Sequence, residues 1–268
     1  MQPQPLYLPE NLHAAFELRY SWTGWPTRPP FPPEPAVLEQ VAPLWKADGM
    51  RLLERYWSDD MIQLTFSANP QVAPAFLAGR AKGRLQHVLR NATAGFDGFS
   101  RKVAVRSVGH NCREDVEAYI ASQVDAAHFA DPSFDALISE FTVVCKNVDL
   151  SAPSESAHGR YWYNLHVVLV TAQRYWVTDR ARLGTLRDWS FRIAAKKGYA
   201  ISRLSVMPDH LHASLRGNIE HSPQAIVLAF QNNLAYALGQ VRLWTDSFYA
   251  GTFSEYDMWA IRRKKSPL

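Results

Sequence analysis

The chain has 268 residues, enough for one large domain or two of ordinary size. Hydrophobic residues make up 47% of it and charged residues 20%, a composition that excludes a largely disordered protein. The sequence predicts no transmembrane segment, since it lacks an apolar run of about 18 residues, and no signal peptide at its start. The two cysteines, Cys112 and Cys145, form no CxxC pair, which excludes a disulfide scaffold and a cysteine zinc site and favours a reducing cytoplasm.

The predicted elements form two similar series in chain order. Each series has a strand of aromatic and β-branched residues, a helix, a further strand, a second helix, and a short extended segment with a closing helix. The first series has the strand ELRYSWTGW (17–25), the helix Leu38–Glu54, the strand IQLTFS (62–67) and the helix KGRLQHVLR (82–90). The second has the strand LHVVLVTAQRY (165–175), the helix Leu183–Lys197, the strand HLHASL (210–215) and the helix QNNLAYALG (231–239).

A tandem duplication is the favoured interpretation of the two series. Equivalent positions lie at nearly constant separations: 147 residues from Gln63 to His210, 149 from Lys82 to Gln231, and 145 both from Ser107 to Thr252 and from Val116 to Ile261. The sequence therefore predicts an α+β protein with domains over 1–130 and 160–268, each a mostly antiparallel sheet flanked by helices. The polar stretch SAPSESAHG marks 131–159 as a linker. Two unrelated segments with the same order of elements are the alternative.

A basic segment lies between Arg80 and Arg106. It holds seven basic residues against one acid, Asp97, in a chain whose formal net charge is only +4. Such a concentration is expected of a protein that binds a phosphate backbone, although a solvated basic surface has the same composition. The basic residues are Arg80, Lys82, Arg84, Arg90, Arg101, Lys102 and Arg106.

The string MPDHLHASL carries the sharpest local pattern. His210 and His212 are two residues apart on a predicted strand, so both side chains project from one face while Leu211 points into the core. Two imidazoles on one face can chelate a divalent metal that polarises a phosphodiester. Structural or surface histidines are the commoner explanation of an isolated pair of this kind.

MPDHLH resembles the histidine signature of the HUH single-tyrosine transposases, the insertion sequence 200/605 group and its relatives associated with repetitive extragenic palindromes. The resemblance implies a ferredoxin-like (HUH-type) fold in each half. It also implies that the two histidines and a glutamine bind Mg²⁺ or Mn²⁺, and that a tyrosine on a mobile helix attacks single-stranded DNA at the foot of a hairpin.

The tyrosine signature of this family lies in the other half, in SVGHNCREDVEAYIASQV. Tyr119 and Gln123 are at positions i and i+4, so they share one face of a predicted helix. The resemblance makes Tyr119 the nucleophile, Gln123 the third metal ligand and Gly109 the hinge. We expect Asn111 to cap the helix. An amphipathic helix with a half-buried aromatic residue is the structural alternative for Tyr119.

Neither half has a complete site of this kind. Gln63 and Thr65 stand where the second half has His210 and His212, and Lys264 stands where the first half has Tyr119. Known family members are dimers whose active sites can be built in trans. The same arrangement within this chain implies an intramolecular pseudodimer with one composite site, made of the two histidines with Tyr119 and Gln123.

The resemblance therefore implies a metal-dependent endonuclease and transposase that nicks single-stranded or hairpin DNA and transfers strands through a 5′-phosphotyrosine intermediate. We expect the basic segment to contact DNA, with Arg262 and Arg263 near the end of the second half as pseudo-symmetric partners. We also expect a monomer that acts as a pseudodimer, with Mg²⁺ or Mn²⁺ as cofactor. The alternatives are a domesticated DNA- or RNA-hairpin-binding protein without catalysis, and a hydrolase of small phosphoesters, which leaves Tyr119 and Gln123 unexplained.

Overall fold

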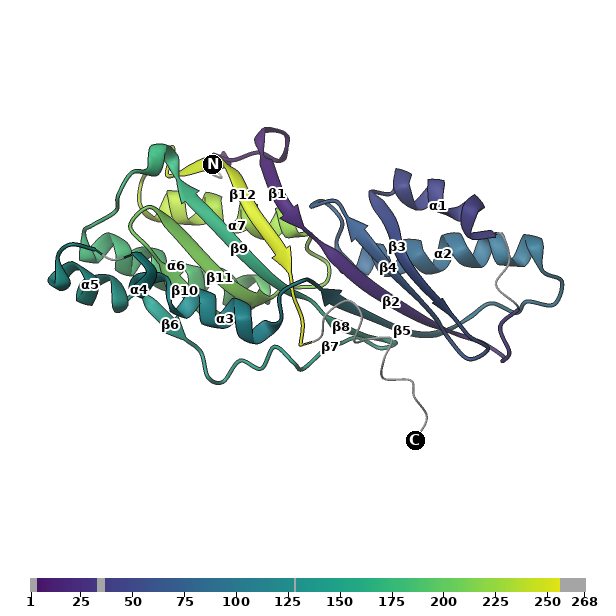
Figure 1. Cartoon of the computed structure of the whole chain (residues 1–268). Coiled ribbons are helices and arrows are strands. Elements are labelled where there is room, and N and C mark those ends of the chain that lie inside the picture. Colours follow the sequence, from purple (N-terminus) through teal and green to yellow (C-terminus); the bar gives the residue numbers. More distant parts are fainter. Residues whose placement is uncertain (1–3, 33–36, 128, 256–268) are drawn as a thin grey trace.

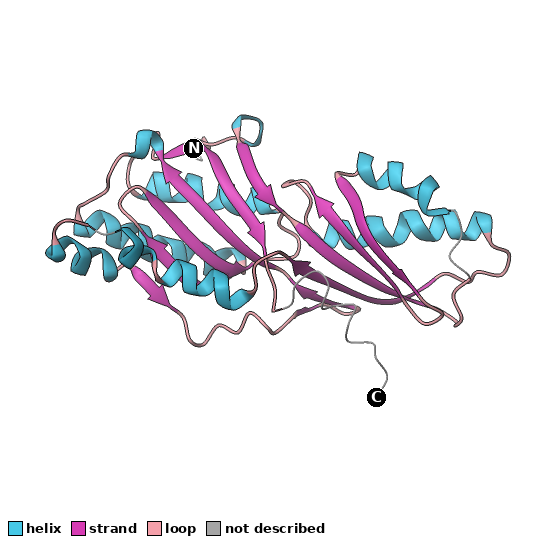
Figure 2. Cartoon of the chain, in the orientation of Figure 1, coloured by secondary structure: helices cyan, strands magenta, loops and turns pink. Residues whose placement is uncertain are grey.

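The computed structural model describes residues 4–32, 37–127 and 129–255 (Figure 1). The strands of these residues form two six-stranded sheets that lie next to each other, with helices packed on them (Figure 2). The α+β class predicted from the sequence is confirmed. Among the described residues, no helix combines the length and the apolar character that crossing a bilayer requires.

The elements of the first half alternate between strands and helices, and α1 and α2 are its two longer helices. In chain order they are η1 (Pro9–Asn11), β1 (His13–Glu17), β2 (Arg19–Pro26), α1 (Val37–Ala47), β3 (Met50–Trp57), β4 (Ile62–Ala68), α2 (Pro74–Ala92), β5 (Phe99–Val108), α3 (Arg113–Ala121) and α4 (Gln123–Ala127). The remaining elements are α5 (Pro132–Ser139), β6 (Thr142–Val144), β7 (Ser154–Glu155), β8 (Gly159–Trp162), β9 (Asn164–Thr171), η2 (Ala172–Arg174), α6 (Arg180–Lys197), β10 (Ala200–Val206), β11 (His210–Arg216), α7 (Pro223–Ala237) and β12 (Trp244–Thr252).

Both sheets contain the same four-strand unit. The order is β3-β4-β2-β5 in the first sheet and β10-β11-β9-β12 in the second, and all neighbours within each unit are antiparallel. The strands of one unit follow those of the other in the same chain order, with α1 matching α6 and α2 matching α7. This topology agrees with the two parallel series of elements found in the sequence.

Each sheet also contains a strand from the other half. β1 pairs in parallel with β12, and β8 pairs in parallel with β5. The register is equivalent in the two places: Ala14 lies opposite Phe248, and Gly159 lies opposite Val103, so each partner is displaced by the same 145 residues. The two halves therefore hold each other by reciprocal strand exchange, which places the start of one half on the sheet of the other (Figure 1).

Reciprocal hydrogen bonds join the halves where the last strands of the two units cross. The Ser107 hydroxyl donates to the Phe253 carbonyl at 2.8 Å, and the Thr252 hydroxyl donates to the Val108 carbonyl at 2.6 Å. Ser107 and Thr252 are one of the pairs aligned from the sequence. Both hydroxyl groups are buried, so each bond satisfies polar atoms that water does not reach.

The helices of the second sheet have regular ends and a buried face. Asp179 caps α6 by accepting a hydrogen bond from the Arg182 amide, and Gly198, with a φ of 73°, ends it in the left-handed conformation. Leu183, Leu186 and Ile193 form the buried side of this helix, at helical spacing. α6 and α7 cover one face of the second sheet, and the other face is left for α3 (Figure 1).

The helix predicted over Leu38–Glu54 is wrong beyond Ala47. A turn with Gly49 in the left-handed conformation, at a φ of 79°, ends α1, and β3 begins at Met50. The segment MRLLERYW contains leucines that also suit a helix, but antiparallel pairing with β4 determines its conformation.

The segment predicted as a linker, 131–159, is structured. It contains α5 and β6, and β6 extends the second sheet by pairing with β10, while β7 pairs with β8 at the edge of the first sheet. Both β6 and β7 are short edge strands, each with a strand partner on one side only.

Candidate active site

The helix that carries Tyr119 belongs to the first half by sequence but packs on the sheet of the second. α3 lies on β10 and on β11, the strand that carries the histidine motif. Glu117 anchors it: this carboxylate accepts a hydrogen bond from the Ser202 hydroxyl at 2.7 Å and lies 3.3 Å from the Arg203 guanidinium. A segment of each half therefore contributes to the space above the second sheet.

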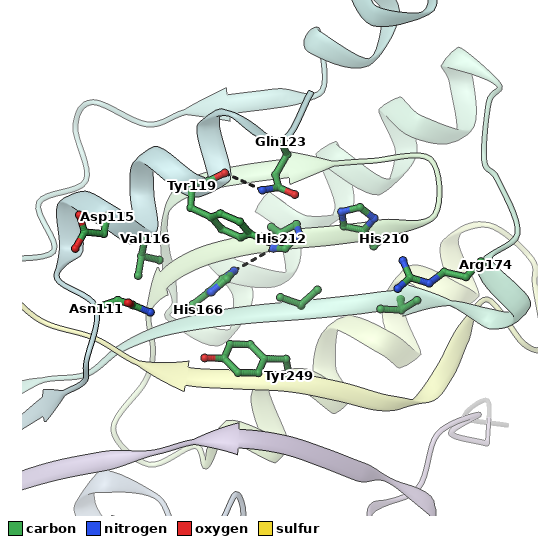
Figure 3. Close-up of a pocket in the computed structure, with 12 residues that line it drawn as sticks. Asn111, Asp115, Val116, Tyr119, Gln123, His166, Arg174, His210, His212 and Tyr249 are labelled. Carbon is green, nitrogen blue, oxygen red and sulfur yellow. Dashed lines mark hydrogen bonds between the residues drawn. The ribbon is translucent and has the colours of Figure 1, made fainter. Parts of the chain in front are cut away.

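A cavity of about 720 Å³ lies between α3 and this sheet (Figure 3). It contains the four residues for which the sequence predicts a composite site: Tyr119, Gln123, His210 and His212. The complete lining is Asn111, Asp115, Val116, Tyr119, Gln123, His166, Val168, Val170, Arg174, His210, His212 and Tyr249.

Three imidazoles lie side by side on the floor of the cavity. His210 and His212 project from the same face of β11, with ring centroids 4.8 Å apart, while Leu211 is buried in the core as predicted. His166 comes from the neighbouring strand β9, and its Nε2 is 3.0 Å from Nδ1 of His212. On the other side, Nδ1 of His210 is 2.6 Å from the Asp209 carboxylate. Both histidines of β11 are thus oriented through Nδ1, which leaves each Nε2 available to a ligand.

The inner histidines are neutral at physiological pH. Burial lowers the pKa of His212 to about 2, with smaller contributions from the neighbouring His166 and His210, and burial lowers that of His166 to about 4. For Asp209, burial opposes ionisation, but the hydrogen bonds and charges of His210 and Arg174 outweigh it and lower its pKa. Neutral imidazoles beside an ionised carboxylate are the protonation states that suit metal binding.

Tyr119 lies above the histidines with half of its side chain open to solvent. Its exposed fraction is 52%, so the phenol is accessible to a large substrate. The ring meets His212 edge-on at a centroid distance of 5.5 Å and His166 at 5.9 Å. The Gln123 side-chain amide donates to the Tyr119 carbonyl at 2.8 Å, which leaves its own oxygen to face other groups (Figure 3).

The start and end of the tyrosine helix differ from the prediction. Cys112, not Asn111, is the N-cap of α3, because the Asp115 carboxylate accepts from its backbone amide and thiol. The helix ends at Ala121, and Gln123 begins α4, so Tyr119 and Gln123 do not share one continuous helix. The turn between the two helices still brings both side chains to the cavity.

Gly109, the predicted hinge, lies where two chains cross. A Cβ at this position would overlap the carbonyl oxygen of Thr252, so the close approach of β12 requires a glycine. Mobility of the segment that follows stays a prediction.

The donor set of the cavity fits a divalent metal ion. Imidazole nitrogens and an amide oxygen can coordinate a divalent transition-metal ion such as Mn²⁺, and the oxygen ligand also suits Mg²⁺. Among the described residues no group of three or more His, Cys, Asp or Glu side chains is placed to bind a metal, and the Gln123 amide lies in the same cavity as the two histidines.

The predicted DNA-binding residues lie on the first sheet and its helix, away from the cavity. Several of them already have protein partners: Arg80 and Arg84 pair with Asp48, and Arg106 stacks on Trp162 with its guanidinium carbon 3.9 Å from the ring centroid. Lys82 donates to the Ser100 carbonyl and Arg90 to the Asp97 carbonyl, while Arg101 and Lys102 are exposed on β5. Arg262 and Arg263, and Lys264 with them, lie outside the described residues.

His166 is the histidine of the cavity that the sequence analysis missed, and Arg174 and Tyr249 also line the cavity without having been predicted. It is a single histidine in an otherwise apolar strand, and it meets His212 only through the pairing of β9 with β11. The alternation of NLHVVLVT would place its side chain on one face of the strand, and the order of the strands decides which residues it meets.

A comparison with protein families finds a match in the second half of the chain. Residues 160–263 match the family model described as IS200-like transposase. The chain matches none of the curated proteins. Among solved structures, a candidate transposase from Deinococcus radiodurans is similar at 24% identity, with 38% of this chain and 86% of that chain covered and a TM-score of 0.30.

Two further structures are similar over more of the chain but at lower scores. One is the regulatory subunit of aspartate kinase from Thermus thermophilus, at 10% identity and a TM-score of 0.19, with 80% of this chain and 93% of that chain covered. The other is a candidate transcriptional repressor of the glycine cleavage system, at 12% identity and a TM-score of 0.23, with 87% of this chain and 96% of that chain covered. Superpositions with such scores carry no argument, so the assignment rests on the family model. Residues 160–263, which contain all three histidines of the cavity, are therefore similar to the IS200-like transposases.

Proposed function

We propose that this protein nicks single-stranded DNA at hairpins and transfers strands through a 5′-phosphotyrosine intermediate formed on Tyr119. The observation that carries the proposal is that Tyr119, from the first half, lies in one cavity with His210 and His212, from the second half. The transposase family of residues 160–263 supports DNA as the partner.

Tyr119 is the group placed to react with the DNA backbone. Its phenol oxygen forms a bond to the scissile phosphorus as the bond from phosphorus to the 3′-oxygen breaks. The phenol gives up its proton and the leaving 3′-oxygen takes one, so the products are a phosphotyrosine at the 5′ end and a free 3′-hydroxyl. Since one phosphodiester replaces another, rejoining to a different 3′-hydroxyl needs no ATP.

The neighbouring side chains would hold a Mg²⁺ or Mn²⁺ ion. His210 and His212 would bind through Nε2, because their Nδ1 atoms contact Asp209 and His166, and Gln123 would bind through its amide oxygen. The bound ion supplies charge stabilisation to the phosphate.

We further propose that the chain is an intramolecular pseudodimer of two ferredoxin-like HUH units with a single working site. The matching strand orders and the reciprocal exchange of β1 and β8 support the duplication. The sequence alignment of Gln63 and Thr65 with His210 and His212 is shifted by two residues, because the strand registers put Gln63 in the position of His212 and Ser21 in that of His166. Gln63 donates to Ser21 at 2.8 Å.

DNA bound in the cavity would extend towards the first sheet. The exposed Arg101 and Lys102 on β5, with the basic residues of α2, would contact its phosphates as sequence-independent binding requires. In this arrangement the hairpin stem lies on the first half and the scissile phosphate on the second, with Gly109 in the segment that joins β5 to α3.

The test is covalent capture. Single-stranded hairpin oligonucleotides from the DNA that flanks the gene are incubated with Mn²⁺ and analysed on a denaturing gel. We expect a protein–DNA band with the unmodified protein, none with Tyr119→Phe, and an unchanged band with Tyr236→Phe, which removes an exposed hydroxyl on α7. Because the phenol is half exposed, Tyr119→Phe should leave DNA binding nearly unchanged.

The result separates the proposal from its main alternative. Hairpin DNA that is retarded in a native gel, without any covalent band under any metal condition, would make the protein a hairpin-binding protein that has lost catalysis. A covalent band that survives Tyr119→Phe would show that another residue is the nucleophile.

A further inference from the structure

Two exposed aromatic side chains follow directly after a residue of the cavity. Arg174 lines the cavity, and Tyr175 and Trp176 come next in the loop that joins β9 to α6, with exposed fractions of 55% and 50%. Folding buries most aromatic side chains because their apolar surface is large. Two neighbouring aromatic side chains left half open beside a cavity indicate a surface that binds something.

The loop is fixed rather than free. The Thr171 hydroxyl donates to the Tyr175 carbonyl at 2.8 Å, and the Val177 amide donates to the Pro208 carbonyl at 2.7 Å, in the turn that leads to the histidine motif. Gln173 and Arg174 both adopt the left-handed conformation, with φ of 56° and 55°. This conformation is unfavourable for residues other than glycine, so the surrounding contacts hold the loop in this shape.

The indole of Trp176 is supported from behind. It is parallel to the Phe134 ring, with 1° between the planes and 6.1 Å between the centroids, and the Phe129 ring meets it edge-on at 5.8 Å. An aromatic ring with packed neighbours and an exposed remainder loses little conformational entropy on binding. Trp176 is therefore a preorganised flat surface.

A chain of polar contacts connects this loop to the histidines. The Arg174 guanidinium lies 2.9 Å from the Asp209 carboxylate, whose other oxygen lies 2.6 Å from Nδ1 of His210. Two-thirds of the Arg174 side chain is exposed, so its charge also faces solvent at the edge of the cavity. A ligand on the aromatic pair would thus have a cation and the proposed catalytic groups beside it.

We infer that Tyr175 and Trp176 form a stacking subsite for the unpaired bases of single-stranded DNA next to the scissile phosphate, with Arg174 facing the backbone. The inference rests on the proposed function, in which the cavity receives a phosphodiester. Stacking suits this ligand because every base presents a π-face once it is unpaired, whereas the bases of a duplex are covered by their neighbours. The subsite therefore selects single strands over duplex DNA.

The test compares two fluorescein-labelled probes of equal charge: a twelve-nucleotide oligothymidine and a twelve-nucleotide abasic strand. All proteins carry Tyr119→Phe, so that binding is measured without adduct formation. We expect the parent protein to bind oligothymidine more tightly than the abasic strand. Trp176→Ala and Tyr175→Ala should each weaken oligothymidine binding by about tenfold and leave abasic binding unchanged.

Two controls separate stacking from folding. Trp176→Phe and Tyr175→Phe keep a π-face and should retain most of the preference for bases, which a loss of loop structure would not. Tyr236→Ala removes an equally exposed ring from α7 and should leave binding of both probes unchanged. A single 5-iodouracil in the oligothymidine should photo-crosslink to the peptide that contains Tyr175 and Trp176.

Several results would overturn the inference. These are an unchanged preference for bases in both alanine variants, an equal loss in Tyr236→Ala, or a crosslink confined to other peptides. A dimer that becomes monomeric on Trp176→Ala with DNA binding intact would assign the surface to a second copy of the chain. Preferential binding of oligouridine through the same residues would assign it to RNA.

The subsite and the proposed chemistry fail independently. Base-dependent binding that requires Trp176, in a protein that never forms an adduct with hairpin DNA, would refute the nicking proposal and leave the subsite. Adduct formation by a Trp176→Ala, Tyr175→Ala double variant with unchanged dependence on DNA concentration would refute the subsite alone.

Discussion

His166 differs from the other two histidines of the cavity because its proposed role is to support His212, one of the proposed metal ligands. Its Nε2 lies 3.0 Å from Nδ1 of His212, and both rings are neutral because burial lowers their pKa values. One of the two nitrogens must donate the proton in this pair. If Nε2 of His212 binds a metal, its Nδ1 carries the proton and donates to Nε2 of His166, so that His166 would hold His212 in this tautomer and orientation, as residues behind a metal ligand commonly do.

Removing this support should weaken metal binding without removing a ligand. We expect His166→Ala to lower the affinity for Mn²⁺ by about 10- to 100-fold, and His210→Ala to lower it further. Isothermal titration of the protein with Mn²⁺ alone measures both. His87→Ala, which removes an exposed histidine from α2, is the matched control and should leave the affinity unchanged. Equal affinities for His166→Ala and the control would contradict the positioning role.

The sequence predicted those site residues whose positions follow from local periodicity or from a motif. His210 and His212 share a face because a strand alternates, and Tyr119 belongs to a recognisable helix motif. His166 has no such local partner. It joins the site through the pairing of β9 with β11, which a single sequence does not reveal.

At the scale of elements, Gly109 and Gly83 lie in opposite surroundings, one crowded and one open. At Gly109 a Cβ would overlap the Thr252 carbonyl oxygen, whereas a Cβ at Gly83, on the exposed side of α2, would have nothing within 4 Å. We expect Gly109→Ala to destabilise the fold by about 1–3 kcal/mol through overpacking. Gly83→Ala should stabilise it by about 0.5–1 kcal/mol, because alanine favours the helix. Urea unfolding of both variants measures the two changes.

The elements also show where sequence prediction stops. The histidine strand and α6 agree with the prediction, since their periodicity and caps are local. The helix predicted over 231–239 forms but begins eight residues earlier, at Pro223, and the predicted closing helix lies outside the described residues. Two features differ from the prediction: the helix of Tyr119 breaks between α3 and α4, and β3 begins within the predicted helix 38–54. In both places tertiary packing overrides local propensity. Gly109→Ala tests such a contact: a stability unchanged from that of the unmodified protein would mean that β12 does not approach β5 this closely in solution.

For the molecule as a whole, one displacement of 145 residues relates many contacts between the halves. The Asn164 amide donates to the Ser107 hydroxyl at 3.1 Å, and its counterpart, the Arg19 amide, donates to the Thr252 hydroxyl at 2.8 Å. The sequence showed the separation of 145 residues between Ser107 and Thr252. It did not predict the exchange of β1 and β8, because strand exchange pairs segments that are far apart in the sequence. The boundaries 1–130 and 160–268 therefore stay a prediction about the duplicated units, whereas each folded sheet contains a strand from the other half.

The interlocking of the halves can be tested by cutting the chain between them. Lys146 and Asn147 are exposed between β6 and β7, so a protease recognition sequence inserted there should be cleaved without unfolding the sheets. The first fragment carries β1, which pairs with β12, and α3, which packs on β10 and β11, while the second fragment carries β8, which pairs with β5. We expect two bands on a denaturing gel but a single peak, at the size of the intact chain, in gel filtration.

Because the proposed site combines Tyr119 from one fragment with His210 and His212 from the other, the cut protein should still form the phosphotyrosine adduct. Fragments that elute separately without denaturant would contradict the exchange of β1 and β8.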